Sequence, residues 1–232
     1  MKIYNPFKDL TTFERILLTI SLVVVSLSFM LSPEKDWLTL IVSLIGVIDL
    51  IFVAKGYLLG QILGIVFSVL YGIISFIFHY YGEVITYMGM TAPMAIASLV
   101  SWIKHPYKNT KEVEIQRMNS RQVVLMFILA SLVTVAFYFI LKALSTVNLL
   151  FSTISIATSF LAVYMTYMRS PFYAIAYGLN DIVLITLWIL ASIANPAYIP
   201  MIFCFVMFLA NDTYAFVAWM KRMKKQEKGL NH

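Results

Sequence analysis

Long apolar runs, separated by short polar segments, follow one another along almost the whole chain. A membrane-spanning helix needs about 20 predominantly apolar residues, because each residue adds ~1.5 Å and the hydrocarbon core is ~30 Å thick. Segments of strictly alternating polarity, which are typical of a transmembrane β-barrel, do not occur in the sequence. The pattern predicts an all-α integral membrane protein with eight transmembrane helices, near residues 14–31, 37–54, 57–79, 84–103, 122–142, 147–167, 171–193 and 198–220.

Composition supports a protein of the lipid bilayer and excludes several other classes. Of the 232 residues, 61% are hydrophobic and 12% are charged, whereas soluble domains have roughly 45–50% apolar and about 25% charged residues. The single cysteine, Cys204, rules out a disulfide framework within the chain, and the sequence predicts neither a metal site nor a cofactor. The net charge of +6 comes from residues between the apolar runs, so no nucleic-acid partner is predicted.

The basic residues predict how the spans are oriented. With eight spans and the N-terminus inside, the outer segments hold only Lys35 and Lys142, and the other fifteen of the 17 Lys and Arg residues lie inside. Cytoplasmic segments of membrane proteins carry such an excess of Lys and Arg. An odd number of spans would put the basic central loop and the basic tail on opposite sides. Both termini are therefore predicted to be cytoplasmic.

Two parts of the chain resemble each other weakly. Spans two to four end in Trp102 and Lys104, and spans six to eight end in Trp219 and Lys221. Because the two halves begin four spans apart, they point the same way, which predicts two parallel three-helix repeats. The predicted units are an N-terminal segment with an accessory helix (1–34), a first three-helix bundle (35–105), a loop with a linker helix (106–145), a second three-helix bundle (146–221) and a basic tail (222–232).

Polar side chains inside the spans are the candidates for a binding site, because placing them in lipid costs free energy unless they are satisfied. In the seventh span Tyr173, Tyr177 and Asn180 share one helical face, and in the eighth Asn211 and Tyr214 lie about one turn apart. We predict the following substrate-binding residues: Gln61, Ser68, Tyr87, Thr91, Tyr173, Tyr177, Asn180, Asn211 and Tyr214.

These features also have structural interpretations. The Gly and Ser residues of the third span are more often a close helix–helix contact than a binding site. Asn180 and Asn211 are either interhelical hydrogen-bond partners or lining residues, and we favour lining because both lie inside spans that should be neighbours. Three single acids are open to two interpretations, a proton site or a structural group paired with a basic residue: Asp49, Asp181 and Asp212.

The motifs of most enzyme classes are missing from the sequence. It contains no nucleophile arrangement, P-loop or dinucleotide fingerprint, so an enzyme is not predicted, and an ATP-driven pump would need a partner that supplies the motor. We favour a carrier of a small solute. The alternative from another class is a membrane enzyme or signalling scaffold, against which stands the lack of clustered His, Cys or acidic residues at a span end.

An ordered set of residues in both halves carries a family resemblance. The set comprises Ala54-Lys55-Gly56, Gly64, Tyr71, Tyr81-Gly82-Glu83, Pro93, Trp102, Arg169, Asn180, Asn211, Tyr214 and Trp219. It resembles the PnuC family of bacterial nicotinamide riboside transporters over about residues 37–225. The resemblance implies a 3+1+3 helix arrangement like that of the SWEET sugar transporters, often with one more N-terminal helix. The chain departs from the family at a Trp-x-x-Trp motif, where it has Tyr173 and Ala176.

The resemblance implies facilitated diffusion of nicotinamide riboside by alternating access across the bacterial inner membrane. It also implies a separate cytoplasmic kinase that traps the solute by phosphorylation, and it leaves a homo-oligomer open. Tyrosine faces suit the cationic pyridinium ring, and amide side chains offer a donor and an acceptor to its carboxamide. No Lys or Arg lies in the middle of a span, which favours the nucleoside over a nucleotide. The alternative solutes are another flat vitamin, thiamine or riboflavin-like, or a sugar.

Overall fold

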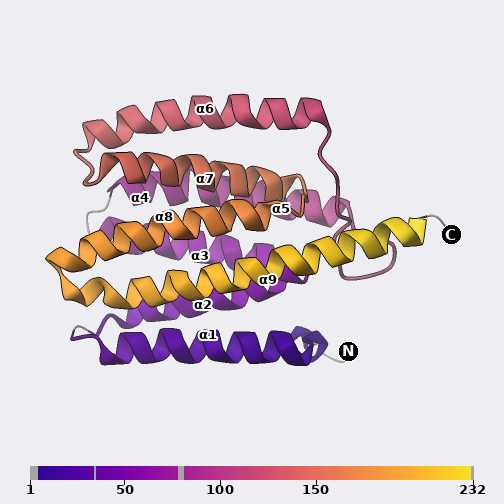
Figure 1. Ribbon diagram of the computed structural model, residues 1–232, viewed down its shortest axis with the longest axis horizontal. Helices are drawn as coiled ribbons and strands as arrows, with labels where there is room; N and C mark the ends of the chain where they lie inside the picture. Colours follow the sequence, from indigo (N-terminus) through magenta and orange to yellow (C-terminus); the bar gives the residue numbers. More distant parts are fainter. Residues whose placement is uncertain (1–4, 34, 78–80, 231–232) are drawn as a thin grey trace.

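Helices make up almost all of the protein, for which a computed structural model describes residues 5–33, 35–77 and 81–230. Within these ranges eight helical segments are long and apolar enough to cross a membrane, and they lie side by side in one bundle (Figure 1). The predicted all-α membrane fold is confirmed. The helices are α1 (Thr12–Leu31), α2 (Trp37–Ala54), α3 (Leu58–Ile77), α4 (Tyr81–Thr86), α5 (Ala92–Lys104), α6 (Ser120–Ala143), α7 (Leu149–Tyr167), α8 (Tyr173–Ala194) and α9 (Ile199–Leu230).

Capping residues decide where two of the helices begin. At α1 the Glu14 N–H donates to Thr11 Oγ1 at 3.3 Å, and the Thr11 N–H donates to Glu14 Oε2 at 2.7 Å. Asn119 and Gln122 form the same reciprocal pair at α6, with both bonds at 2.9 Å. Such a pair satisfies backbone donors that the first helical turn leaves free. Both helices consequently begin within two residues of their predicted starts.

The fourth span is not one continuous α-helix. A π-helical turn, Tyr87–Thr91, joins α4 to α5, and in it the Ala92 N–H donates to the Tyr87 carbonyl. Pro93 follows directly, near the start of α5, and it has no backbone N–H to donate to the preceding turn. π-Helical turns are frequent at functional sites. Here Tyr87 and Thr91, at the two ends of the turn, both reach the cavity described below.

The two halves of the chain meet through two pairs of helices. α2 packs against α9, and α5 packs against α7. The first helix of each half thus contacts the last helix of the other half. Outside this arrangement α1 packs on α2 and α9, and α6 packs on α7. The space between the halves, bordered by α2, α5, α7 and α9, is where polar residues of both halves come together.

Both ends of the described chain lie at the same end of the bundle, together with the loop between α5 and α6 (Figure 1). We call this the basic end. α9 continues to Leu230, so the segment predicted as a basic tail is helical up to that residue. The loop packs along this extension, because the Ile115 N–H donates to Gln226 Oε1 at 2.8 Å and Gln226 Nε2 donates to the Val113 carbonyl at 3.0 Å.

Arg169 fastens the turn between α7 and α8 to the basic end. Its guanidinium donates to Ser101 Oγ at 2.7 Å, to Gln116 Oε1 at 2.7 Å and to the Glu114 carbonyl at 3.1 Å. Burial lowers the pKa of Arg169, while the Glu114 charge opposes this shift. Since the ordinary pKa of arginine lies above about 12, the group stays charged. Arg169 is thus a fixed cation that joins α5, the loop and the second half.

Candidate functional site

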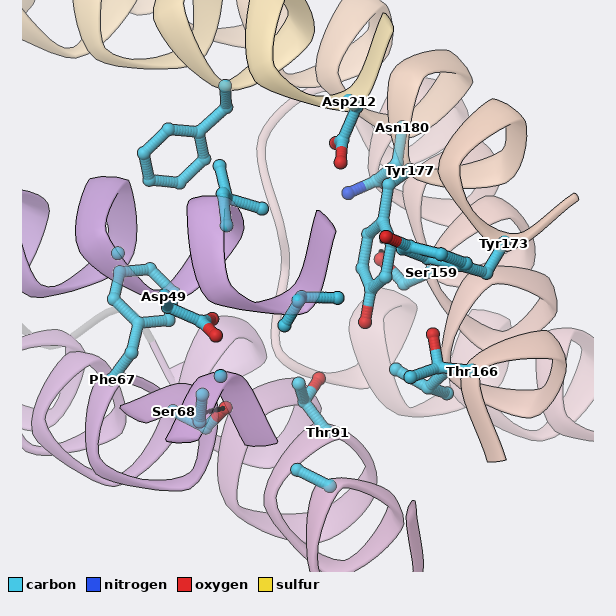
Figure 2. A pocket seen from close by; sticks show the side chains of 18 of the residues that line it. Asp49, Phe67, Ser68, Thr91, Ser159, Thr166, Tyr173, Tyr177, Asn180 and Asp212 are labelled. Atoms are coloured by element: carbon cyan, nitrogen blue, oxygen red, sulfur yellow. Dashed lines mark hydrogen bonds between the residues drawn. The ribbon is translucent and has the colours of Figure 1, made fainter. Parts of the chain in front are cut away.

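A cavity of about 120 Å³ lies between the two halves of the bundle. Its walls come from α2, α3, the π-helical turn and α5 on one side and from α7, α8 and α9 on the other (Figure 2). The volume has room for several water molecules, since one needs roughly 10–15 Å³. Seven of the nine predicted site residues line this cavity: Gln61, Ser68, Tyr87, Thr91, Tyr173, Tyr177 and Asn180.

The amide of Asn180 is oriented by α7. Its Oδ1 accepts hydrogen bonds from the hydroxyls of Thr158 at 2.9 Å, Ser155 at 3.0 Å and Ser159 at 3.1 Å. With the oxygen held in this way, the NH₂ group points into the cavity (Figure 2). Asn180 therefore presents donors to a solute, rather than the side-by-side donor and acceptor that its residue type suggests. These three hydroxyls are not among the predicted site residues, although their i, i+3, i+4 spacing marks one helical face.

Asn211 and Tyr214 do not line the cavity, and the prediction that they do is wrong. Asn211 Nδ2 donates to Ser21 Oγ of α1 at 3.0 Å. The Tyr214 hydroxyl donates to Glu14 Oε1 of α1 at 2.8 Å. Successive residues of a helix are rotated by about 100°. For that reason Asp212, rather than its neighbour Asn211, faces the cavity from α9.

The helix predicted as accessory, α1, is joined to both halves through Glu14, which forms a buried ion pair with one half and accepts a hydrogen bond from the other. Lys55 Nζ, at the end of α2, lies 3.0 Å from Glu14 Oε2, and the Glu14 side chain is 2% exposed. The same carboxylate accepts the hydrogen bond from Tyr214 of α9. Glu14 thus connects α1, α2 and α9 at one point, on the side of α9 that faces away from the cavity.

Three carboxyl groups line the cavity besides the predicted residues. They belong to Asp49 of α2, Asp181 of α8 and Asp212 of α9. Asp181 and Asp212 are both buried, at 4% and 2% exposed. A Cβ on Gly64 would lie 3.1 Å from Asp49 Oδ2, so the glycine leaves room for this carboxyl group. Among the described residues no Lys, Arg or His lines the cavity and no salt bridge involves these acids, so pairing with a basic residue is not their role.

Aromatic rings lie at both ends of the cavity. Towards the basic end Tyr173 packs edge-on against Trp219, with ring centroids 4.8 Å apart, and Trp219 lies 5.5 Å from Trp102. Towards the opposite end the rings of Phe67 and Phe208 meet at 6.1 Å. A flat solute in the cavity would therefore have an aromatic face near it from either direction.

Comparisons with known proteins agree with this architecture. The sequence family described as "Nicotinamide mononucleotide transporter" matches residues 36–221. The nicotinamide riboside transporter PnuC of Neisseria mucosa is 25% identical to the chain over 229 residues, which cover 94% of this chain and 85% of that protein. A crystal structure of the vitamin B3 transporter PnuC has the same fold, with a TM-score of 0.80, 24% identity and 94% of both chains covered. Because the family match extends over most of the 232 residues, the chain belongs to the nicotinamide mononucleotide transporter family, the PnuC family that its ordered motif residues indicate.

Proposed function

We propose that this protein carries nicotinamide riboside across a bacterial inner membrane. The observation that supports this best is the cavity between the two halves, to which the first half contributes Gln61 and Thr91 and the second half Tyr173, Tyr177 and Asn180. A carrier needs such a site at the interface of two units that move against each other. The similarity to the Neisseria mucosa nicotinamide riboside transporter, over 94% of the chain, favours this solute.

The lining residues match the chemistry of nicotinamide riboside. Its pyridinium ring is a flat cation, which the faces of Tyr173 and Tyr177 attract by about 2 kcal/mol when water is excluded. The NH₂ group of Asn180 suits the oxygen of the carboxamide. The ribose hydroxyls need partners that both donate and accept, and Gln61 and Thr91 provide them from the opposite wall.

The cavity favours the nucleoside over its phosphorylated form. Recognition of a phosphate group usually depends on Arg or Lys, or on the N-terminus of a helix. Among the described residues the cavity has no basic side chain, and three carboxyl groups line it. A phosphate dianion would find no positively charged partner among these lining residues. We therefore infer that nicotinamide mononucleotide is excluded, although the family description names it.

The mode of transport that we propose is facilitated diffusion with alternating access. The two halves rock about the cavity, and a separate cytoplasmic kinase traps the solute by phosphorylation, since the chain itself contains no P-loop. We place the basic end, and with it both termini, in the cytoplasm, because basic residues concentrate on that side of membrane proteins. A homo-oligomer of this chain is compatible with this mechanism.

Uptake of labelled nicotinamide riboside into proteoliposomes that contain the purified protein tests the proposal. We expect uptake well above that of protein-free vesicles, without ATP or an ion gradient. Uptake indistinguishable from protein-free vesicles would reject it. Thermal unfolding with nicotinamide riboside, nicotinamide mononucleotide, thiamine, riboflavin or a sugar identifies the solute, because a ligand that binds only the folded protein raises its stability. Stabilisation by thiamine alone would support the second candidate, a thiamine carrier.

A further inference from the structure

The cavity contains buried polar atoms that have no partner among the residues that the structure describes. Asp181 is 4% exposed and Tyr173 is 1% exposed, and both line the cavity. Asp181 Oδ2, the Tyr173 hydroxyl and Asp49 Oδ1 are buried without a hydrogen-bond partner. A buried polar atom without a partner costs about 1–3 kcal/mol, and more if it is charged. Three such atoms around one space indicate that a bound molecule completes their interactions.

The three carboxyl groups of the cavity have no positively charged partner among the described residues. Burial disfavours the ionised form of a carboxyl group, whereas a cation beside it favours that form. Asp212, like Asp181, is almost completely buried, at 2% exposed. No basic side chain of the described chain lines the cavity. A cation that enters the cavity therefore favours ionisation of these carboxyl groups and is attracted by the charge that results.

The cation that fits is organic rather than a metal ion. Among the described residues no group of three or more His, Cys, Asp or Glu side chains is arranged to hold a metal ion. Instead the acids share the cavity with an aromatic ring, because Asp49, Asp212 and Tyr177 all line it. The Asp49 carboxyl, from the first half, and the Tyr177 ring, from the second, project into the same space (Figure 2). Carboxylates beside an aromatic face are suited to a flat ring with delocalised positive charge.

From these observations we propose that Asp49, Asp181 and Asp212 act as the counter-charge that makes the carrier select singly cationic, flat heterocycles over uncharged molecules of the same shape. This inference rests on the proposed function and names the property of the solute that the cavity recognises. The acids come from both halves of the bundle, so the cation holds α2 against α8 and α9. Selection by the charge of the solute therefore requires both halves of the bundle.

The test compares the affinities of two probes, nicotinamide riboside and its reduced dihydro form, which lacks the positive charge. We expect the purified full-length protein to bind the cation more tightly. Single substitutions Asp49→Asn, Asp181→Asn and Asp212→Asn keep the shape of the side chain and remove its charge. Each should lower the ratio of the two affinities about tenfold, because one buried charge changes binding of a cation by at least about 1.4 kcal/mol.

Glu83→Gln is the matched control, since Glu83 is an acid of a membrane-spanning helix that lies outside this cavity. It should leave the ratio unchanged. Equal affinity of the unsubstituted protein for the two probes would overturn the inference without any variant. An unchanged ratio in all three Asn variants, with the cation still bound, would overturn it while leaving the proposed function intact. If the unsubstituted protein binds neither probe, the proposed function fails and the inference fails with it.

Discussion

Trp102 and Trp219 make equivalent hydrogen bonds, each from one half of the bundle to the other half. The indole N–H of Trp102, in α5, donates to the Thr166 carbonyl in the last turn of α7 at 3.0 Å. The indole N–H of Trp219, in α9, donates to the Val53 carbonyl in the last turn of α2 at 2.9 Å. Each half thus donates from its last helix to the end of the first helix of the other half. The two buried rings lie between the cavity and the basic end.

The first prediction concerns this pair of indoles. Replacing both with phenylalanine keeps aromatic rings and removes two interhelical hydrogen bonds, each worth about 1 kcal/mol. We expect the basic end to open more often. Ser98 is a buried residue that lines the cavity, so the substitution Ser98→Cys reports how often the basic end opens. The background variant carries Cys204→Ser, which removes the single native cysteine. A membrane-impermeant maleimide should label it up to about thirtyfold faster in the double Phe variant.

Trp188→Phe is the control for this experiment, because Trp188 packs on Tyr198 away from the basic end, with ring centroids 5.6 Å apart. It should not change the labelling rate. Equal labelling rates in the double Phe variant and the control would show that the two indole hydrogen bonds do not hold the basic end closed.

The second prediction concerns Asn180. Asn180→Ala removes the NH₂ donors from the cavity and leaves the three α7 hydroxyls without their shared acceptor. Calorimetry should show nicotinamide riboside bound at least about tenfold more weakly, in line with the loss of a hydrogen bond in a buried site. Asn195→Ala is the control, because Asn195 caps the short turn before α9 through the Ala197 N–H at 3.0 Å. Unaltered affinity in Asn180→Ala would exclude Asn180 as a contact of the solute.

The third prediction distinguishes Asn211 from Asn180. Since Asn211 bonds Ser21 of α1, Asn211→Leu should lower the free energy of unfolding by about 1–3 kcal/mol and leave the affinity for nicotinamide riboside unchanged. Ser21→Ala removes the same bond from the other side. The double variant should therefore lose less stability than the two single losses combined. A large loss of affinity in Asn211→Leu, with stability retained, would contradict the arrangement of α9.

The fourth prediction concerns the ion pair of Glu14 and Lys55. Lys55→Met leaves a buried carboxylate without its cation and should destabilise the protein by about 3–5 kcal/mol. The double variant Glu14→Gln, Lys55→Met removes both charges, and we expect it to be more stable than Lys55→Met alone. Thermal unfolding in detergent measures both. Lys111→Met, which breaks the exposed pair with Asp9, should change stability by less than about 1 kcal/mol. Equal effects of Lys55→Met and Lys111→Met would show that α1 is not anchored through Glu14.

The site was only partly predictable. Seven predicted residues face one cavity because the spacing of residues on a single helix, such as Tyr173, Tyr177 and Asn180, determines which side chains share a face. Such spacing does not say which neighbouring helix that face meets. On α9 both Asn211 and Asp212 are polar, and the packing of α1 decides that Asn211 faces away from the cavity. Asp49 lies more than a hundred residues before Asp181 and Asp212 in the sequence, so nothing local indicates that the three acids meet.

The sequence by itself determined the membrane fold, the number of spans and the family of this protein. These properties depend on local quantities, namely the length of each apolar run, the placement of Lys and Arg, and an ordered set of motif residues. Only the tertiary structure decided that α1 is bonded to α2 and α9, that the Asn180 oxygen is held by α7, and that Asp49 joins Asp181 and Asp212. The physical reason is that these contacts depend on the rotation of each helix against its neighbours, which the packing of the whole bundle sets.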